Sequence, residues 1–104
     1  MADYGICEVH YNDDHSKIEE VHAFEIIEND AGEKHTDGIK HTFSKESIIL
    51  RIDCGDKVTT LIKNDKGEWD RGSKVIVYTE DKGKFIRTKN NTKKVDNLGE
   101  LPEY

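Results

Sequence analysis

Four polar residues whose side chains suit ligand binding lie close together near the end of the sequence: Arg87, Lys89, Asn90 and Asn91. An arginine can bind a phosphate group through two parallel hydrogen bonds, and an asparagine amide both donates and accepts. Phe85 lies just before this group, and Trp69 lies in a polar context where complete burial is difficult. Aromatic rings in strands usually belong to the core, but an exposed ring can stack on a flat base. The six residues together predict a site for a small phosphorylated ligand.

The segment that carries most of these residues is basic, although the whole chain is acidic. Residues 82–94 contain six basic side chains and no acidic one, whereas the chain has a formal net charge of −6. A local positive charge attracts a phosphate-bearing ligand or an acidic partner surface. The alternative is a solvated strand edge, because lysines on an edge strand prevent aggregation with other sheets. The sequence leaves both interpretations open.

Motifs for catalysis or metal binding are missing from the sequence. The five histidines lack the spacing of a zinc site, and no Cys-x-x-Cys pair, Gly-x-Ser-x-Gly motif or glycine-rich phosphate loop occurs. His10 and His22 could be neighbours across a hairpin, but a third metal ligand is lacking. We therefore expect a binding protein rather than an enzyme, with no metal and no cofactor.

The composition is that of one small domain spanning residues 1–104. Hydrophobic residues make up 34% of the chain and charged residues 37%, so the core must be thin, and we expect a homo-oligomer that completes it. The net charge argues against a general nucleic-acid binder or a protein of anionic membranes. No apolar stretch approaches the ~20 residues of a transmembrane helix, and no signal peptide opens the chain, so we expect a cytoplasmic protein. Cys7 and Cys54 are too few for a disulfide framework, and we expect both to be small buried residues.

The first half of the chain predicts a hairpin, a weak strand and a helix. Residues 4–11 alternate, with Cys7, Val9 and Tyr11 on one face, and residues 17–27 are hydrophobic enough for a longer second strand. The polar run 33–42 predicts a weak third strand. Ser44 is a suitable N-cap for a helix of about three turns that ends at Gly55.

The second half of the chain predicts three more strands. Residues 57–63 are rich in β-branched side chains, and residues 73–79 and 84–88 are joined by a loop short enough to fix a hairpin. The fold class is therefore α+β, with a mostly antiparallel sheet of about five or six strands and one helix packed on it.

The end of the chain resembles a family of small bacterial and phage domains of unknown function. The resemblance lies in the strand Lys84-Phe85-Ile86-Arg87-Thr88 and in the tail Val95-Asp96-Asn97-Leu98-Gly99-Glu100-Leu101-Pro102. Members of that family close with an aromatic or aliphatic-Arg-Thr strand and an Asp-Asn-Leu-x-x-Leu-Pro tail. The tail also has a structural interpretation: Asp96 and Asn97 form an Asx-type turn, and Leu98 and Leu101 fold back onto the sheet.

The chain is more distantly similar to phage anti-Thoeris proteins, small oligomeric sponges that sequester a cyclic ADP-ribose isomer. The similarity lies in size, in one helix against a sheet, and in a pocket built from arginine, asparagine and an aromatic ring. It implies that Arg87, Asn90, Asn91 and Phe85 hold the ligand. The resulting expectation is a non-enzymatic sponge for a cyclic nucleotide or cyclic ADP-ribose-type signal, acting in the cytoplasm of a bacterial host. The alternative is a small protein-interaction module or inhibitor that docks on a host protein.

Overall fold

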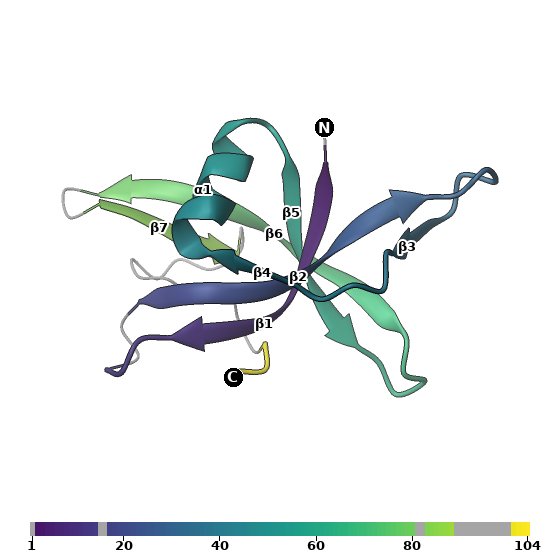
Figure 1. Cartoon of the computed structure of the whole chain (residues 1–104), viewed down its shortest axis with the longest axis horizontal. Helices are drawn as coiled ribbons and strands as arrows, with labels where there is room; N and C mark the ends of the chain where they lie inside the picture. Colours follow the sequence, from purple (N-terminus) through teal and green to yellow (C-terminus); the bar gives the residue numbers. More distant parts are fainter. Residues whose placement is uncertain (1, 15–16, 81–82, 89–100) are drawn as a thin grey trace.

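Strands form most of the part of the chain that the structure describes, and one short helix in that part packs on them (Figure 1). The computed structural model describes residues 2–14, 17–80, 83–88 and 101–104. The elements are β1 (Asp3–Tyr11), β2 (Ile18–Glu28), β3 (Lys34–Thr36), β4 (His41–Ser44), α1 (Lys45–Asp53), β5 (Lys57–Lys63), β6 (Trp69–Glu80) and β7 (Gly83–Thr88). The expected α+β class is confirmed. Within the described ranges, no helix is long and apolar enough to cross a membrane.

The sheet is mixed rather than purely antiparallel. Its strand order is β3-β2-β1-β5-β6-β7, and β4 also pairs with β2. The pairs are antiparallel except β1 with β5, which run parallel with Tyr4 opposite Val58. Parallel strands need a long crossover connection, and here α1 is part of that connection. The connection between the parallel strands β1 and β5 therefore includes the helix, which follows β4 and precedes β5 in the sequence.

The weak third strand expected over residues 33–42 is two short strands on one edge of β2. β3 pairs with β2 through Ile26↔Thr36, and β4 pairs with it through Ala23↔His41. Between these pairs, residues 37–40 oppose only two residues of β2, so the chain bulges outward there. This bulge places Lys40 beside β1, where it contributes to the surface described below.

The expected alternation along β1 is wrong beyond Ile6. The register with β2 shifts between Ile6 and Glu8, so Ile6 and Val9 both join the main core, whereas Cys7 joins a second cluster on the other face. A β-bulge inserts one residue and reverses the alternation that follows it. The sequence contains no separate signal for this irregularity.

The helix forms where the sequence predicts it. Ser44 caps it by accepting a hydrogen bond from the Ser47 backbone N–H at 3.1 Å. At the other end, Gly55 takes a positive φ of 96° and donates to the Ile52 carbonyl at 3.0 Å, as C-terminal glycines commonly do. Cys54 is the C-cap residue and is exposed, so the expectation that it is buried is wrong, whereas Cys7 is buried as expected.

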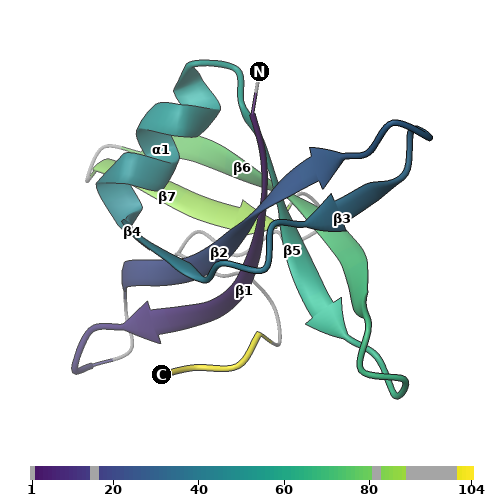
Figure 2. The same ribbon diagram turned by 45° about the vertical axis from the view of Figure 1, so that its right-hand side comes forward.

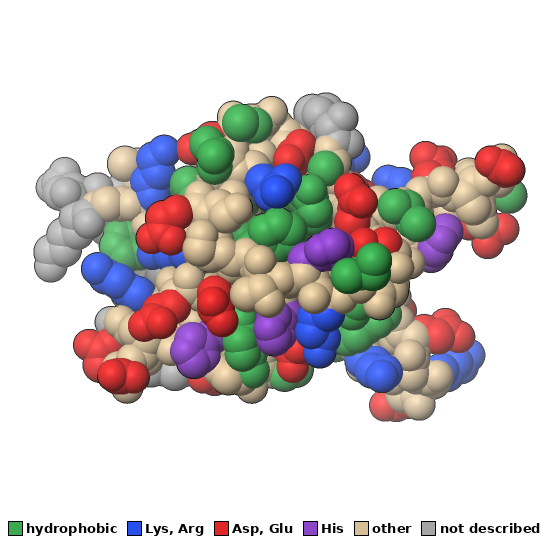
Figure 3. Space-filling view, viewed as in Figure 1, with side chains coloured by type: hydrophobic (Ala, Val, Ile, Leu, Met, Phe, Trp, Pro, Cys, Tyr) green, Lys and Arg blue, Asp and Glu red, His purple; other side chains and the backbone are tan. Residues whose placement is uncertain are grey.

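Two hairpins, β2–β3 and β5–β6, project from the same side of the molecule as two prongs (Figures 2 and 3). Their tips have matching sequences: Asn29-Asp30-Ala31-Gly32-Glu33 and Asn64-Asp65-Lys66-Gly67-Glu68. In each tip the asparagine Oδ1 accepts two backbone N–H groups at 2.9 to 3.0 Å, and the glycine has φ near 80°. Such an Asx turn fixes the hairpin locally. The two prongs therefore have the same type of turn at their tips.

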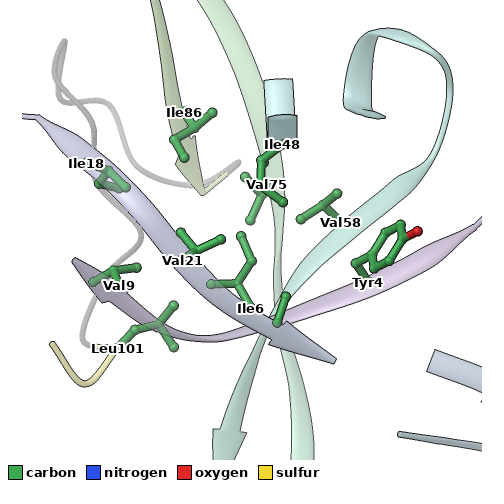
Figure 4. Close-up of a cluster of buried hydrophobic side chains, with 11 residues drawn as sticks. Tyr4, Ile6, Val9, Ile18, Val21, Ile48, Val58, Val75, Ile86 and Leu101 are labelled. Atoms are coloured by element: carbon green, nitrogen blue, oxygen red, sulfur yellow. The ribbon is translucent and has the colours of Figure 1, made fainter. Parts of the chain in front are cut away.

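The main core lies between α1 and the sheet (Figure 4). Ile6, Val21, Ile48 and Ile86 are fully buried there and come from three strands and the helix. Leu101 also reaches this core, so the expectation that it folds back onto the sheet is confirmed. The Val9 N–H donates to the Pro102 carbonyl at 2.9 Å, which adds the C-terminal residues to the edge of β1 that β5 leaves free. Leu98, Asp96 and Asn97 lie outside the described residues.

Candidate functional site

Of the sequence-predicted site residues that the structure describes, Trp69 lies far from Arg87. Lys89, Asn90 and Asn91 lie outside the described residues. Arg87 on β7 pairs with Ile76, seven residues along β6 from Trp69, which is about 20 Å in an extended strand. The expected grouping of Trp69 with Arg87 is therefore wrong.

Phe85 and Arg87 already have packing partners within the fold. Phe85 is 9% exposed, and its ring lies beneath the Lys45 Nζ and 5.4 Å from the Tyr78 ring. The Arg87 guanidinium lies 4.3 Å from the centroid of Tyr78. The Phe85 ring is thus a core ring rather than a free stacking platform, which is the interpretation that most often applies to strand aromatics.

Trp69 belongs to a second apolar cluster on the face of the sheet opposite α1. Cys7, Phe24 and Leu61 are buried in this cluster, and Ile26 and Trp69 pack on it while remaining partly exposed. The Trp69 ring lies 5.5 Å from the Phe24 ring with a 50° tilt between them. One part of this second cluster is therefore open to ligands.

The open part is a cleft between the two prongs, which we call the inter-hairpin cleft. Its volume is about 540 Å³, within the range of small-molecule sites. Figure 3 shows the notch between the prongs, with hydrophobic side chains at its base. The lining residues are Ile26, Lys34, His35, Thr36, Leu61, Glu68, Trp69 and Arg71.

The two cations of the cleft, Lys34 and Arg71, are held by one half-buried carboxylate group. Asp3 Oδ2 accepts a hydrogen bond from Arg71 Nη2 at 2.7 Å and lies 3.6 Å from Lys34 Nζ. Asp3 is only 14% exposed, whereas the Arg71 side chain is 37% exposed and that of Lys34 is 49% exposed. Arginine has five N–H donors and lysine three, so donors remain for a ligand after Asp3 is bound. Asp3 therefore sets two cations side by side at the cleft.

A second hollow adjoins the cleft and shares Leu61 and Trp69 with it; we call it the tail-side hollow. Its volume is about 370 Å³. The remaining lining residues are Cys7, Glu8, Lys40, Ile62, Lys63, Leu101 and Pro102. The hollow thus joins β1, β5, the bulge before β4 and the C-terminal residues on one surface.

Ion pairs organise the wall of the tail-side hollow. Glu8 lies 2.7 Å from Lys40 Nζ and accepts a hydrogen bond from His22 Nδ1 at 3.0 Å. Lys40 and His22 lower the pKa of the Glu8 carboxyl by stabilising its charged form. The expected pairing of His22 with His10 is wrong, because His22 pairs across the strands with Glu8.

Tyr104 covers the outer side of this ion-pair network. Its ring stacks on His22 with 3.8 Å between centroids, and its hydroxyl donates to Glu20 at 3.2 Å. The backbone oxygen of Tyr104 accepts from His10 Nδ1. Burial and the Glu20 carboxylate raise the pKa of the Tyr104 hydroxyl well above its usual range, so it remains a neutral donor.

Burial and neighbouring charges set the protonation of the thiol on this face. Burial, followed by the neighbouring Glu8 charge, raises the pKa of the Cys7 thiol, which keeps it protonated and unreactive. In the part of the chain that the structure describes, no three His, Cys, Asp or Glu side chains are grouped to hold a metal ion. An indole ring, an apolar floor and paired cations are instead suited to holding a flat, anionic molecule.

Sequence reasoning missed Lys34, His35 and Arg71, although a signal for the cleft was present. Residues 26–33 and 61–68 share the pattern [Ile/Leu]-Ile-x-Asn-Asp-x-Gly-Glu. Ile26 and Leu61 are its first residues, and they face each other as the apolar floor of the cleft. Comparing the two segments would have shown two equivalent hairpins, with Trp69 and Arg71 following the second tip.

The comparisons with known proteins place the chain in a family but supply no function. No significant match was found among the curated proteins or among the solved structures. The model of one protein family, described as "Protein of unknown function (DUF3892)", matches residues 5–102. That match covers both prongs, the helix and every residue that lines the two hollows, but it does not include Asp3. The chain belongs to this DUF3892 family.

Proposed function

We propose that the protein is a non-enzymatic binding module that holds a small phosphorylated nucleotide in the inter-hairpin cleft. The carrying observation is that Asp3 sets Arg71 and Lys34 side by side next to Trp69 and the apolar floor. A base would lie against Trp69, Leu61 and Ile26, and its phosphate would pair with the two cations. This proposal keeps the ligand class that the sequence predicts and moves the site from β7 to the prongs.

The biological role that fits such binding is sequestration of a signalling nucleotide in the cytoplasm of a bacterial host, as in the anti-Thoeris sponges. A sponge needs a site that holds its ligand without reacting with it. The raised pKa of Cys7, which lines the adjoining tail-side hollow, supports this role, because a protonated thiol is a poor nucleophile. A second copy of the chain would complete the thin core, so we propose that the sponge is a homo-oligomer.

A thermal-shift screen against 5′-AMP, cyclic AMP, cyclic dinucleotides and ADP-ribose tests the proposal. A nucleotide at 100 times its dissociation constant should stabilise the wild-type protein by about 2.7 kcal/mol. Arg71→Gln and Trp69→Ala should lose the shift, whereas Lys17→Gln, an exposed lysine next to the β1–β2 turn, should keep it. Mass spectrometry should recover the nucleotide intact. A shift that survives Arg71→Gln, or a chemically altered nucleotide, would contradict the proposal.

A second candidate function, docking on a host protein, is favoured by a groove beside α1. The groove has a volume of about 350 Å³ and contains Ile49 and Leu50, with Leu50 64% exposed. Lys84 and Asp53 form an ion pair of 2.9 Å at its rim. An apolar strip with a charged rim is typical of a protein interface. A partner captured by the wild type and lost by Leu50→Asp, with no nucleotide shift in either protein, would favour this function.

A further inference from the structure

The inter-hairpin cleft and the tail-side hollow adjoin each other at Trp69, and we call the two together the trough. Leu61 and Trp69 line both hollows. A ligand in one hollow that contacts the Trp69 indole therefore lies next to the other hollow. The trough passes from the prongs across the second apolar cluster toward the C-terminal residues Leu101 and Pro102.

Cations line both of the hollows that share the Trp69 indole ring. Arg71 and Lys34 lie in the inter-hairpin cleft, whereas Lys63 and Lys40 lie in the tail-side hollow. The Lys63 Nζ is 5.7 Å from the Trp69 ring centroid, and among the described residues no carboxylate lies within ion-pair distance of it. Lys40 forms an ion pair with Glu8. Lys63 is therefore the lysine of the tail-side hollow that we expect to bind a ligand.

The acidic prong tips limit the length of an anionic ligand. Asp30 and Glu33 lie in one tip, and Asp65 and Glu68 lie in the other together with one lysine, Lys66, all of them exposed, so each tip has more acidic than basic side chains. A polyanion that continued outward between the prongs would approach these carboxylates, and like charges repel each other. The trough therefore suits a short anionic ligand and disfavours a long nucleic acid.

We propose that the ligand is a linear dinucleotide, with one base against Trp69 and phosphate groups on both sides of it. One phosphate pairs with Arg71 and Lys34, and the other pairs with Lys63. This inference rests on the proposed function and extends it, because it names the ligand's length and assigns Lys63 a phosphate contact. The observation behind it is that Trp69 lines two adjoining hollows, each of which has its own cations.

Isothermal titration with 5′-AMP and with the 5′-phosphorylated dinucleotide pApA separates the two proposals. A further charge-assisted phosphate contact should make pApA bind about tenfold tighter than AMP. Lys63→Gln should remove that gain and leave AMP binding unchanged, whereas Lys17→Gln should change neither affinity. Arg71→Gln should weaken both nucleotides.

Three results would overturn parts of this account, and they are distinguishable. If AMP binds and is lost in Arg71→Gln but pApA binds no tighter, the dinucleotide inference is wrong and the proposed function stands. If Lys63→Gln weakens AMP as strongly as pApA, Lys63 belongs to the single-nucleotide site and the inference is wrong. If neither nucleotide binds the wild type, both proposals are wrong.

Discussion

Asp3 on β1 and Arg71 on β6 form a 2.7 Å ion pair across β5, the strand that lies between them. The pair holds a cation of the second prong against the N-terminal end of β1, next to Lys34 of the first prong. An ion pair of this exposure adds about 0–1 kcal/mol to stability, so its main effect is on position and charge.

Replacing Asp3 by Asn should strengthen nucleotide binding. The amide oxygen can still accept the Arg71 hydrogen bond, but the negative charge that competes with a phosphate is removed. We expect about two- to tenfold tighter AMP binding at low salt and a smaller gain at high salt, measured by calorimetry. Weaker binding in Asp3→Asn would contradict the expectation that the Asp3 charge competes with the phosphate.

Replacing Gly5 by Ala should destabilise the protein and disturb the cleft floor. An added Cβ would lie 2.3 Å from Leu61 Cγ and Cδ1, and Leu61 is only 4% exposed, so it must move. Overpacking of this kind costs about 1–3 kcal/mol in the free energy of unfolding, measurable by urea denaturation. In a Leu61→Ala background the same change should cost clearly less, because the clash is gone. Equal costs in the two backgrounds would exclude this clash as the cause.

Replacing Glu8 by Gln should reduce the amount of stability that the protein loses when the pH is lowered. Lys40 and His22 lower the pKa of Glu8 in the folded protein, so the carboxylate stabilises the fold above its ordinary pKa of about 4.5. This contribution is lost as the pH falls through the lower folded value. Denaturation midpoints between pH 7 and 3 should therefore fall less in Glu8→Gln than in Glu19→Gln, an exposed control on β2. Parallel pH curves for the two variants would contradict the assignment.

Replacing Arg51 by Ala should destabilise the junction between α1 and the sheet. The guanidinium lies 5.0 Å from the Tyr4 ring centroid and 4.8 Å from that of Phe43, and Nη1 donates to the Tyr4 hydroxyl at 2.9 Å. Losing these contacts should cost about 1–2 kcal/mol of unfolding free energy. Arg51→Lys keeps the positive charge but not the planar guanidinium, so this variant should have a higher unfolding free energy than Arg51→Ala but a lower one than the wild type. Full recovery by lysine would show that charge alone matters.

The sequence predicted the elements better than their arrangement. The Ser44 cap, the Gly55 stop and the strand over residues 57–63 follow from local chemistry, and each lies where expected. Parallel pairing of β1 with β5 and the bulge after Ile6 depend on contacts between distant segments, and no local pattern records them. For this reason the mixed character of the sheet and the reversed alternation of β1 were not foreseen.

The site was harder to predict, for a related reason. Trp69 was recognised because its polar neighbours make full burial difficult, and it does line the cleft. Lys34 and Arg71 are far apart in the chain and meet only because Asp3 bridges the two prongs. Sequence proximity instead favoured Arg87, which stacks on Tyr78 near the other end of β6.

The fluorescence of Trp69 gives the most direct test of the central claim, that nucleotides bind in the inter-hairpin cleft. Trp69 is the protein's only tryptophan, so its emission reports on the cleft without interference from another indole. Titration with a nucleotide that stabilises the protein should change this emission saturably, with the dissociation constant found by calorimetry, and Arg71→Gln should abolish the change. A nucleotide that binds by calorimetry and leaves the emission of Trp69 unchanged would contradict the claim.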